Sequence, residues 1–253
     1  LMRRWAVDYF NSHDASVAHE FIVPSYTLEI GDYTFAGRDE QWLPAVQQQM
    51  QAFPGMGMTV HQLICSQDRV ATYFSEHGSS GGRIAVWSGV GIYRSNGNQL
   101  TGCVAQEDYM TRQRQLKSGV SDAVESPSPN PWDTEALPPN PEAEAVVRQY
   151  LLNAWPVSLP AVRCDDEHIT GMPLKVEVIG VEFTELFSSG EYVAFHARQT
   201  GFYQGGFAGL QACEKPMLLN SNGILHVQNA QVVSGRVIRD RLGLKARLQK
   251  AAT

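Results

Sequence analysis

The sequence predicts an α+β fold made of two similar halves that are joined by an irregular strap. Each half opens with an amphipathic helix, the first half continues as a run of strands, and the Pro/Ser-rich residues between the halves lack periodicity. A chain of 253 residues with 43% hydrophobic content can bury two separate cores. We therefore expect domains at residues 1–116 and 142–253, with a linker or strap at 117–141.

Three helices are predicted at the start of the first half. Apolar and aromatic residues at helical spacing predict the first over residues 3–12. Asp14 is positioned to cap a second, short helix that ends at Phe21, and an extended segment follows over 26–35. The third helix is predicted over 39–53, because apolar side chains keep helical spacing there until a Pro-Gly pair ends it.

Strands alone are predicted in the rest of the first half. Alternating segments separated by turn residues predict strands at 58–65, 69–77, 83–94 and 100–109, arranged as an antiparallel meander. Helices followed by a curved sheet are typical of an α+β unit.

The second half repeats part of this order. A helix is predicted over 143–153. The spacing from Val193-Ala194 to Gly201 is the same as the spacing from Val70-Ala71 to Gly78. These matches suggest an internal repeat, although no counterpart of the third helix is evident in the second half.

Charge and cysteine usage exclude several classes of partner. A net charge of −6 and an isoelectric point near 5.6 argue against a nucleic-acid-binding or anionic-membrane surface. The one basic cluster, residues 236–247, is interpreted as a solvated face. Four separated cysteines without a C-x-x-C pair predict reduced thiols and a cytoplasmic location. No apolar run is long enough to span a membrane, and a leader removed before Leu1 is left open.

Four short motifs connect the first half with a known family: Asn11-Ser-His-Asp14, Gly37-Arg-Asp-Glu40, Glu76-His-Gly78 and Glu107-Asp108-Tyr109. Together with the order of elements, they make this half resemble the SnoaL-like branch of the NTF2-like superfamily. The resemblance implies two tandem cone-shaped domains, each with N-terminal helices packed in a curved antiparallel sheet, of which the second is degenerate. It also implies an intramolecular pseudo-dimer, and further self-association is left open.

The resemblance also implies a pocket inside the first cone. A pocket of aromatic and apolar side chains can hold a flat hydrophobic molecule while a carboxylate or imidazole moves a proton. We expect a cofactor-independent lyase, isomerase, cyclase or hydrolase without a metal, acting on an aromatic or polyketide-like small molecule. The alternative is a non-catalytic module that binds a small molecule or mediates assembly.

Strand alternation limits the choice of catalytic residues. Glu76 and His77 are neighbours on a predicted strand, so they point to opposite faces and only one can enter the pocket. The resemblance favours His77, because SnoaL-like enzymes often place a pocket histidine on this strand. It also implies a pocket acid near the end of the last strand, which matches Asp108 or, with a register slip of one residue, Glu107. The alternatives are a strand-end hydrogen bond for His77 and pairing of Asp108 with Arg112.

Aromatic and acidic residues near these positions are predicted to bind the substrate as pocket walls: Tyr26, Glu29, Trp42, Trp87 and Tyr109. Ordinary core packing is the alternative for the aromatic members.

The second half lacks the predicted site. Thr200 stands where the repeat would place the histidine, and the acid of Arg239-Asp-Arg241 is expected to face solvent between its two arginines. Asp165-Asp-Glu-His168 contains metal-ligand residue types, but they are consecutive in a predicted loop, so we expect a solvated segment there.

Overall fold

The computed structural model describes residues 1–153 and 160–252 and contains two compact units. The first unit consists of Leu1–Ala105 and Thr111–Ala136, and the second consists of Gln106–Met110 and Leu137–Thr253. The end of the last strand predicted for the first half therefore belongs to the second unit. In the described residues, no helix is both long and apolar enough to cross a membrane.

The helices of the first unit confirm the helical regions predicted from its apolar spacing. They are η1 (Arg4–Asn11), η2 (Ala15–Val17), α1 (Ala18–Phe21), η3 (Arg38–Trp42) and α2 (Leu43–Ala52). The Asp14 carboxylate accepts a hydrogen bond of 3.0 Å from the Ser16 amide and so caps the second helical region as predicted. Gly37 has a φ of 87°, which a side chain rarely adopts, and it turns the chain into η3.

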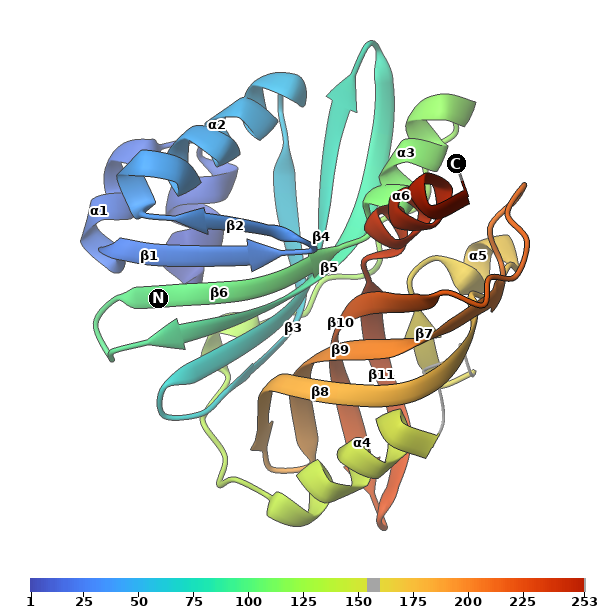
Figure 1. Cartoon of the computed structure of the whole chain (residues 1–253). Helices are drawn as coiled ribbons and strands as arrows, with labels where there is room; N and C mark the ends of the chain where they lie inside the picture. Colours follow the sequence, from blue (N-terminus) through green and yellow to red (C-terminus); the bar gives the residue numbers. More distant parts are fainter. Residues whose placement is uncertain (154–159, 253) are drawn as a thin grey trace. The chain divides into compact units, whose positions relative to one another are not determined.

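A mixed six-stranded sheet forms the other layer of the first unit (Figure 1). Its strands are β1 (Ile22–Ile30), β2 (Tyr33–Ala36), β3 (Gly57–Cys65), β4 (Arg69–Ser80), β5 (Arg83–Ser95) and β6 (Leu100–Glu107). They lie in the order β2-β1-β6-β5-β4-β3, and β1 is parallel to β6. The extended segment predicted over 26–35 is thus two antiparallel strands.

One predicted strand ends early and is followed by a helix. We expected a strand to Tyr109, but β6 ends at Glu107 and α3 (Tyr109–Ser118) begins two residues later. The helix was not predicted because its buried positions include the polar residues Thr111 and Gln115, so the segment has no apolar stripe.

The helices of the first unit cover one face of its sheet. Trp5 of η1 contacts Tyr93 of β5 with ring centroids 5.7 Å apart, and Phe53, directly after α2, contacts Trp87 of β5 at 5.5 Å. Trp87 pairs with Glu76 of β4 in a register without shifts, so Glu76 points to the same face. We call this the helix-covered face.

The second unit repeats the topology of the first without a counterpart of β2 (Figure 1). Its elements are α4 (Pro141–Asn153), β7 (Val162–Cys164), α5 (Glu167–Thr170), β8 (Lys175–Ser189), β9 (Tyr192–Gly205), β10 (Pro216–Gln228), β11 (Gln231–Arg239) and α6 (Arg241–Ala252). The strand order is β7-β11-β10-β9-β8, and β7 is parallel to β11 just as β1 is parallel to β6. The two-domain α+β prediction is confirmed, and the shared topology supports the repeat.

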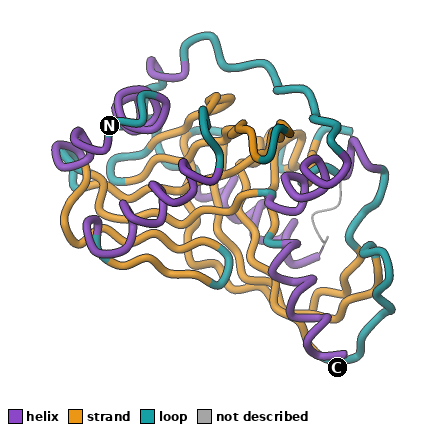
Figure 2. Tube along the Cα trace, turned by 90° about the horizontal axis from the view of Figure 1, so that it is seen from above, coloured by secondary structure: helices purple, strands orange, loops and turns teal. Residues whose placement is uncertain are grey.

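The cores of the second unit lie between its helices and its sheet. In one cluster, Val147 of α4 packs with Phe195 of β9 and Val237 of β11. In another, Leu244 of α6 packs with Tyr203 of β9. Figure 2 shows the strands and the helices, with the C-terminus at the end of a helix. Part of the segment in which no third helix was expected, residues 154–159, lies outside the described residues.

Most of the predicted strap has no regular structure. Its one helical turn is η4 (Pro131–Asp133). The Ser128 amide donates a hydrogen bond of 3.1 Å to the carbonyl oxygen of Val60 on β3. The strap is therefore held along the edge strand of the first unit's sheet.

Candidate functional site

The structure confirms that Glu76 and His77 point to opposite faces, and the helix-covered face carries Glu76. His77 pairs with Gly57 of β3 on the other face. A Cβ atom at Gly57 would lie 3.0 Å from Cε1 and Nε2 of His77, so the imidazole lies directly over this glycine. His77 Nδ1 is buried and has no hydrogen-bond partner in the described part of the chain. Alternation separated the two residues correctly, and a catalytic role for His77 stays a prediction.

Glu76 is a buried carboxylate with both apolar and polar neighbours. Its side chain is 3% exposed, and Met58 and Trp87 flank it as cross-strand neighbours. Gln49 of α2 donates a hydrogen bond from Nε2 to Glu76 Oε2 at 3.3 Å. A carboxylate at this position can accept a proton from a molecule bound on the same face.

Aromatic side chains fill the helix-covered face next to η1 and η3. The Trp42 ring centroid lies 5.3 Å from those of both Tyr9 and Tyr26, and all three residues are at most 2% exposed. The Tyr26 hydroxyl is hydrogen-bonded to Cys103, and burial raises the pKa of Tyr26 well above its usual value. Tyr26 and Trp42 are therefore buried together, and their role as ligand-binding walls stays a prediction.

Two buried hydrogen-bond donors on this face are unused within the described residues. They are the Tyr9 hydroxyl and the Trp5 indole Nε1, on side chains that are 1% and 8% exposed. Burial raises the pKa of Tyr9, so its hydroxyl stays protonated at neutral pH. Buried donors without a partner are uncommon and destabilising, and a bound acceptor would satisfy them. Both residues belong to the apolar and aromatic spacing that predicts the first helix, and their polar atoms were the available signal for a site.

The other predicted wall residues are spread over different environments. Trp87 is 1% exposed, and the Arg112 guanidinium lies 5.0 Å from its ring centroid and 4.8 Å from that of Phe53. Glu29 is exposed and is one of the odd-numbered residues of β1, on the face opposite Tyr26. It therefore does not line the buried aromatic cluster.

Glu107 and Asp108, at the end of β6, also point to opposite faces. Cys103 contacts Tyr26, so alternation puts Glu107 on the same strand face as Cys103 and Asp108 on the opposite one. Glu107 and Tyr109 are both half-buried.

Asp108 forms a buried ion pair in the second unit. Its carboxylate oxygens lie 2.7 and 2.8 Å from Nη2 of Arg241, and the side chain is 2% exposed. Arg241 also contacts Asp166 at 2.8 Å and Asp165 at 3.1 Å. Burial raises the pKa of Asp108, the two other carboxylates raise it further, and Arg241 opposes them. Asp108 is thus committed to Arg241 and not to Arg112, the partner considered from sequence.

The expectation of a solvated segment at 165–168 was wrong for its three acids, which are buried, whereas His168 is exposed. Arg239 is fully buried, donates a hydrogen bond of 2.7 Å from Nε to Asp165, and contacts Glu167. The acids of Asp165-Asp-Glu167 and the arginines at the end of β11 neutralise one another, which allows both segments to leave water. Asp240 is partly buried, and it caps α6 by accepting a hydrogen bond of 2.9 Å from the Gly243 amide.

Comparison with known proteins finds one family. A model for the SnoaL-like domain matches residues 2–102. Among solved structures, the chain is similar to a loop-truncation variant of IdmH from Streptomyces antibioticus, with 26% identity over 43% of this chain and 91% of that chain and a TM-score of 0.38. It is also similar to a protein from Jannaschia sp. CCS1 named as a candidate SnoaL-like polyketide cyclase, with 14% identity, coverage of 46% and 89%, and a TM-score of 0.43. The comparison with curated proteins finds no match.

Proposed function

Because residues 2–102 form a SnoaL-like domain, we propose that the first unit binds a hydrophobic small molecule on its helix-covered face and moves a proton on that molecule. The observation that carries the proposal is the buried Glu76 carboxylate beside Trp87 on this face. The reaction class is that of a cofactor-independent lyase, isomerase, cyclase or hydrolase. Its setting is cytoplasmic, as the reduced cysteines suggest.

Glu76 is the proposed general base. It is placed to remove a proton from a carbon or hydroxyl of the ligand, with Gln49 orienting its carboxylate. His77 and Asp108 are assigned no proton transfer in this proposal.

Tyr9 is proposed to stabilise the charge that develops when the proton leaves. Its raised pKa keeps the hydroxyl protonated, so it can donate a hydrogen bond to a carbonyl oxygen that becomes an oxyanion. The Trp5 indole can donate in the same way. Tyr26, Trp42 and Trp87 would contact the apolar body of the ligand, which favours an aromatic or polyketide-like molecule with a carbonyl group.

Metabolite capture followed by turnover tests this proposal. The protein is mixed with a hydrophobic metabolite extract, bound molecules are identified by native mass spectrometry, and their conversion is measured. Glu76→Gln should lower turnover about 10²-fold or more, the usual scale for a lost general base. Tyr9→Phe, which removes one oxygen atom, should lower turnover while leaving the ligand bound. Full activity in both variants would refute the assignment.

A non-catalytic binding module is the second candidate function, and the dense packing of Tyr9, Tyr26 and Trp42 favours it. A core filled by its own side chains leaves less room for a reacting molecule. This candidate predicts that captured ligands are released unchanged and that Glu76→Gln alters only affinity. Pairing of the two domains as a pseudo-dimer stays a prediction from the sequence.

A further inference from the structure

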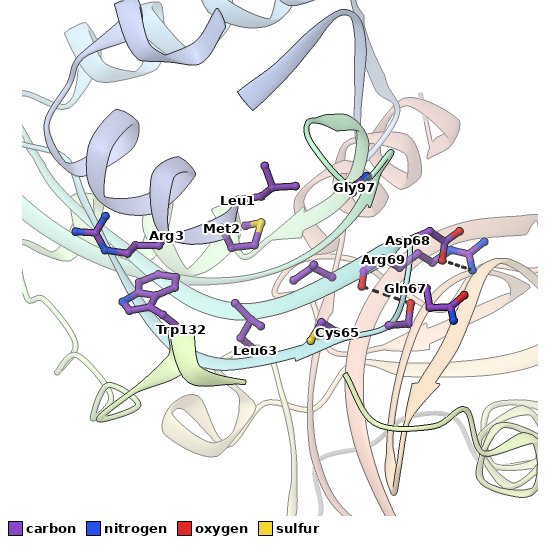
Figure 3. A pocket seen from close by; sticks show the side chains of 13 residues that line it. Leu1, Met2, Arg3, Leu63, Cys65, Gln67, Asp68, Arg69, Gly97 and Trp132 are labelled. Atoms are coloured by element: carbon purple, nitrogen blue, oxygen red, sulfur yellow. Dashed lines mark hydrogen bonds and ion pairs between the residues drawn. The ribbon is translucent and has the colours of Figure 1, made fainter. Parts of the chain in front are cut away.

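The first unit contains a pocket that includes none of the residues assigned to proton transfer (Figure 3). Its volume is about 300 Å³, and it lies at the start of η1, along β3 and at the turn between β3 and β4. Glu76, Tyr9 and Glu107 do not line it. A volume of this size is at the lower end of the range for small-molecule sites.

Apolar side chains from four parts of the unit form the walls. Figure 3 shows Trp132 of η4, Leu63 of β3 and Met2 around the same space, and Val70 of β4 also lines it. Trp132 is held there by the strap, because Cys65 Sγ on β3 contacts the carbonyl oxygen of Thr134 at 3.6 Å. An indole opposite aliphatic side chains suits a flat ring.

Polar groups line the other end of the pocket. Gln67 is an exposed residue at the β3–β4 turn, and Arg69 lies 3.8 Å from the Asp68 carboxylate, which is 65% exposed. Arg3 also lines the pocket, but it lies beside Trp132 (Figure 3) and contacts the Asp8 carboxylate at 3.4 Å. Arg69 and the Gln67 amide are thus the hydrogen-bond donors that this end of the pocket can offer to an anion.

We propose that this pocket is a binding site for a small planar aromatic carboxylate. The ring lies between Trp132 and Leu63, and the carboxylate accepts hydrogen bonds from the Arg69 guanidinium and the Gln67 amide. The site is separate from the proposed reaction on the helix-covered face and does not depend on it. Trp132 gives the strap a role in ligand binding in addition to joining the domains.

Calorimetric titration with 2-naphthoate tests the site in the whole chain. Trp132→Ala and Leu63→Trp, which respectively remove a wall and fill the space, should each weaken binding at least tenfold. Glu76→Gln and Tyr9→Phe should leave the dissociation constant within twofold. Unchanged binding in both wall variants, or loss of binding in Glu76→Gln, would overturn the proposal.

Alkylation of Cys65 gives a second readout that does not require a wall variant to fold. Cys65 lines the pocket and is partly buried, as is Cys213 in the second unit, which does not line it. Saturating 2-naphthoate should slow alkylation of Cys65 by iodoacetamide at least fivefold and leave Cys213 unchanged. Equal rates at Cys65 with and without 2-naphthoate would contradict binding in this pocket.

The charge preference is tested with 2-naphthylmethanol, the neutral analogue of the probe. The wild-type chain should bind 2-naphthoate at least tenfold more tightly than the alcohol, and Arg69→Gln should abolish most of this difference. Asp68→Asn is the matched control and should retain or increase it. Equal binding of acid and alcohol by the wild-type chain would refute the carboxylate assignment.

Discussion

Replacing Arg241 by Met should destabilise the second unit strongly, because three buried carboxylates converge on this guanidinium. Asp108 lies 2.7 and 2.8 Å from it, Asp166 lies 2.8 Å from it and Asp165 lies 3.1 Å from it. Methionine fills similar apolar volume but leaves the carboxylates without this cation. Removing one partner of a buried ion pair costs about 3–5 kcal/mol.

The predicted change is large enough for scanning calorimetry. At about 2–4 °C per kcal/mol for a domain of roughly 150–250 residues, it corresponds to a fall in melting temperature of roughly 6–20 °C. Arg241→Lys should recover part of the loss, since it keeps the charge but not the geometry that contacts several carboxylates.

The pH dependence has a definite sign. Burial already raises the pKa of Asp108 in the folded chain, and loss of Arg241 raises it further. When the pKa of a carboxyl is higher in the folded than in the unfolded state, its protonation stabilises the folded protein. This contribution is lost as pH rises through the folded-state pKa. The deficit of Arg241→Met relative to wild type should therefore be largest at neutral pH and shrink as pH falls toward 5.

A double-mutant cycle separates the coupling free energy between Asp108 and Arg241 from other effects of the substitution on stability. Asp108→Asn removes one negative charge, so Arg241→Met should cost less in that background than in the wild type. A loss below about 1 kcal/mol for Arg241→Met, independent of pH, would refute the buried-pair account and match an exposed pair instead.

Three further predictions concern the cap, the second sheet and the second unit's surface. Asp14→Ala should lower the melting temperature at pH 7, because hydrogen bonds from Ser16 lower the pKa of Asp14 and its carboxylate caps the helix. The contribution of Asp14 to stability is present above the usual aspartate pKa and is lost as pH falls through the folded-state pKa. The melting curves of variant and wild type should therefore converge at low pH. Gly201→Ala should be destabilising by about 1–3 kcal/mol in denaturant titrations, because a Cβ atom there would lie 2.0 Å from the Glu177 carbonyl oxygen; an unchanged midpoint would contradict the strand packing. Hydrogen bonds from His226 and Gln228 lower the pKa of Glu191, so a carboxyl titration followed by NMR should place it below the usual glutamate value, and Gln228→Ala should raise it.

Local patterns in the sequence were sufficient to predict most helices and strands of the fold. Helical spacing identified the segments that became η1 and α2, and alternation identified β3 to β6. Helix α3 was missed because Gln115 is buried through polar contacts, its Oε1 accepting from the Val86 amide at 3.0 Å. A buried polar residue of this kind has no signature in an apolar pattern.

The candidate site was less predictable because it depends on which face of the sheet the helices cover. Alternation showed that Glu76 and His77 point to opposite faces, but tertiary contacts such as those of Phe53 with Trp87 and Trp5 with Tyr93 identify the covered face. The partner of Asp108 was also beyond local reasoning, since Arg241 is 133 residues away in the chain. Contacts at that separation follow from the tertiary fold and leave no trace in neighbouring residues.

Proton exchange at carbon is the most direct test of the central claim, that Glu76 on the helix-covered face is the acid/base group of the first unit. A panel of aromatic ketones is incubated with the protein in D₂O, and deuterium uptake next to the carbonyl is followed by NMR. For a ketone that the wild-type chain exchanges, the account predicts that Glu76→Gln lowers the rate about 10²-fold, whereas His77→Ala changes it less than threefold. Loss of exchange in His77→Ala with full exchange in Glu76→Gln would contradict it.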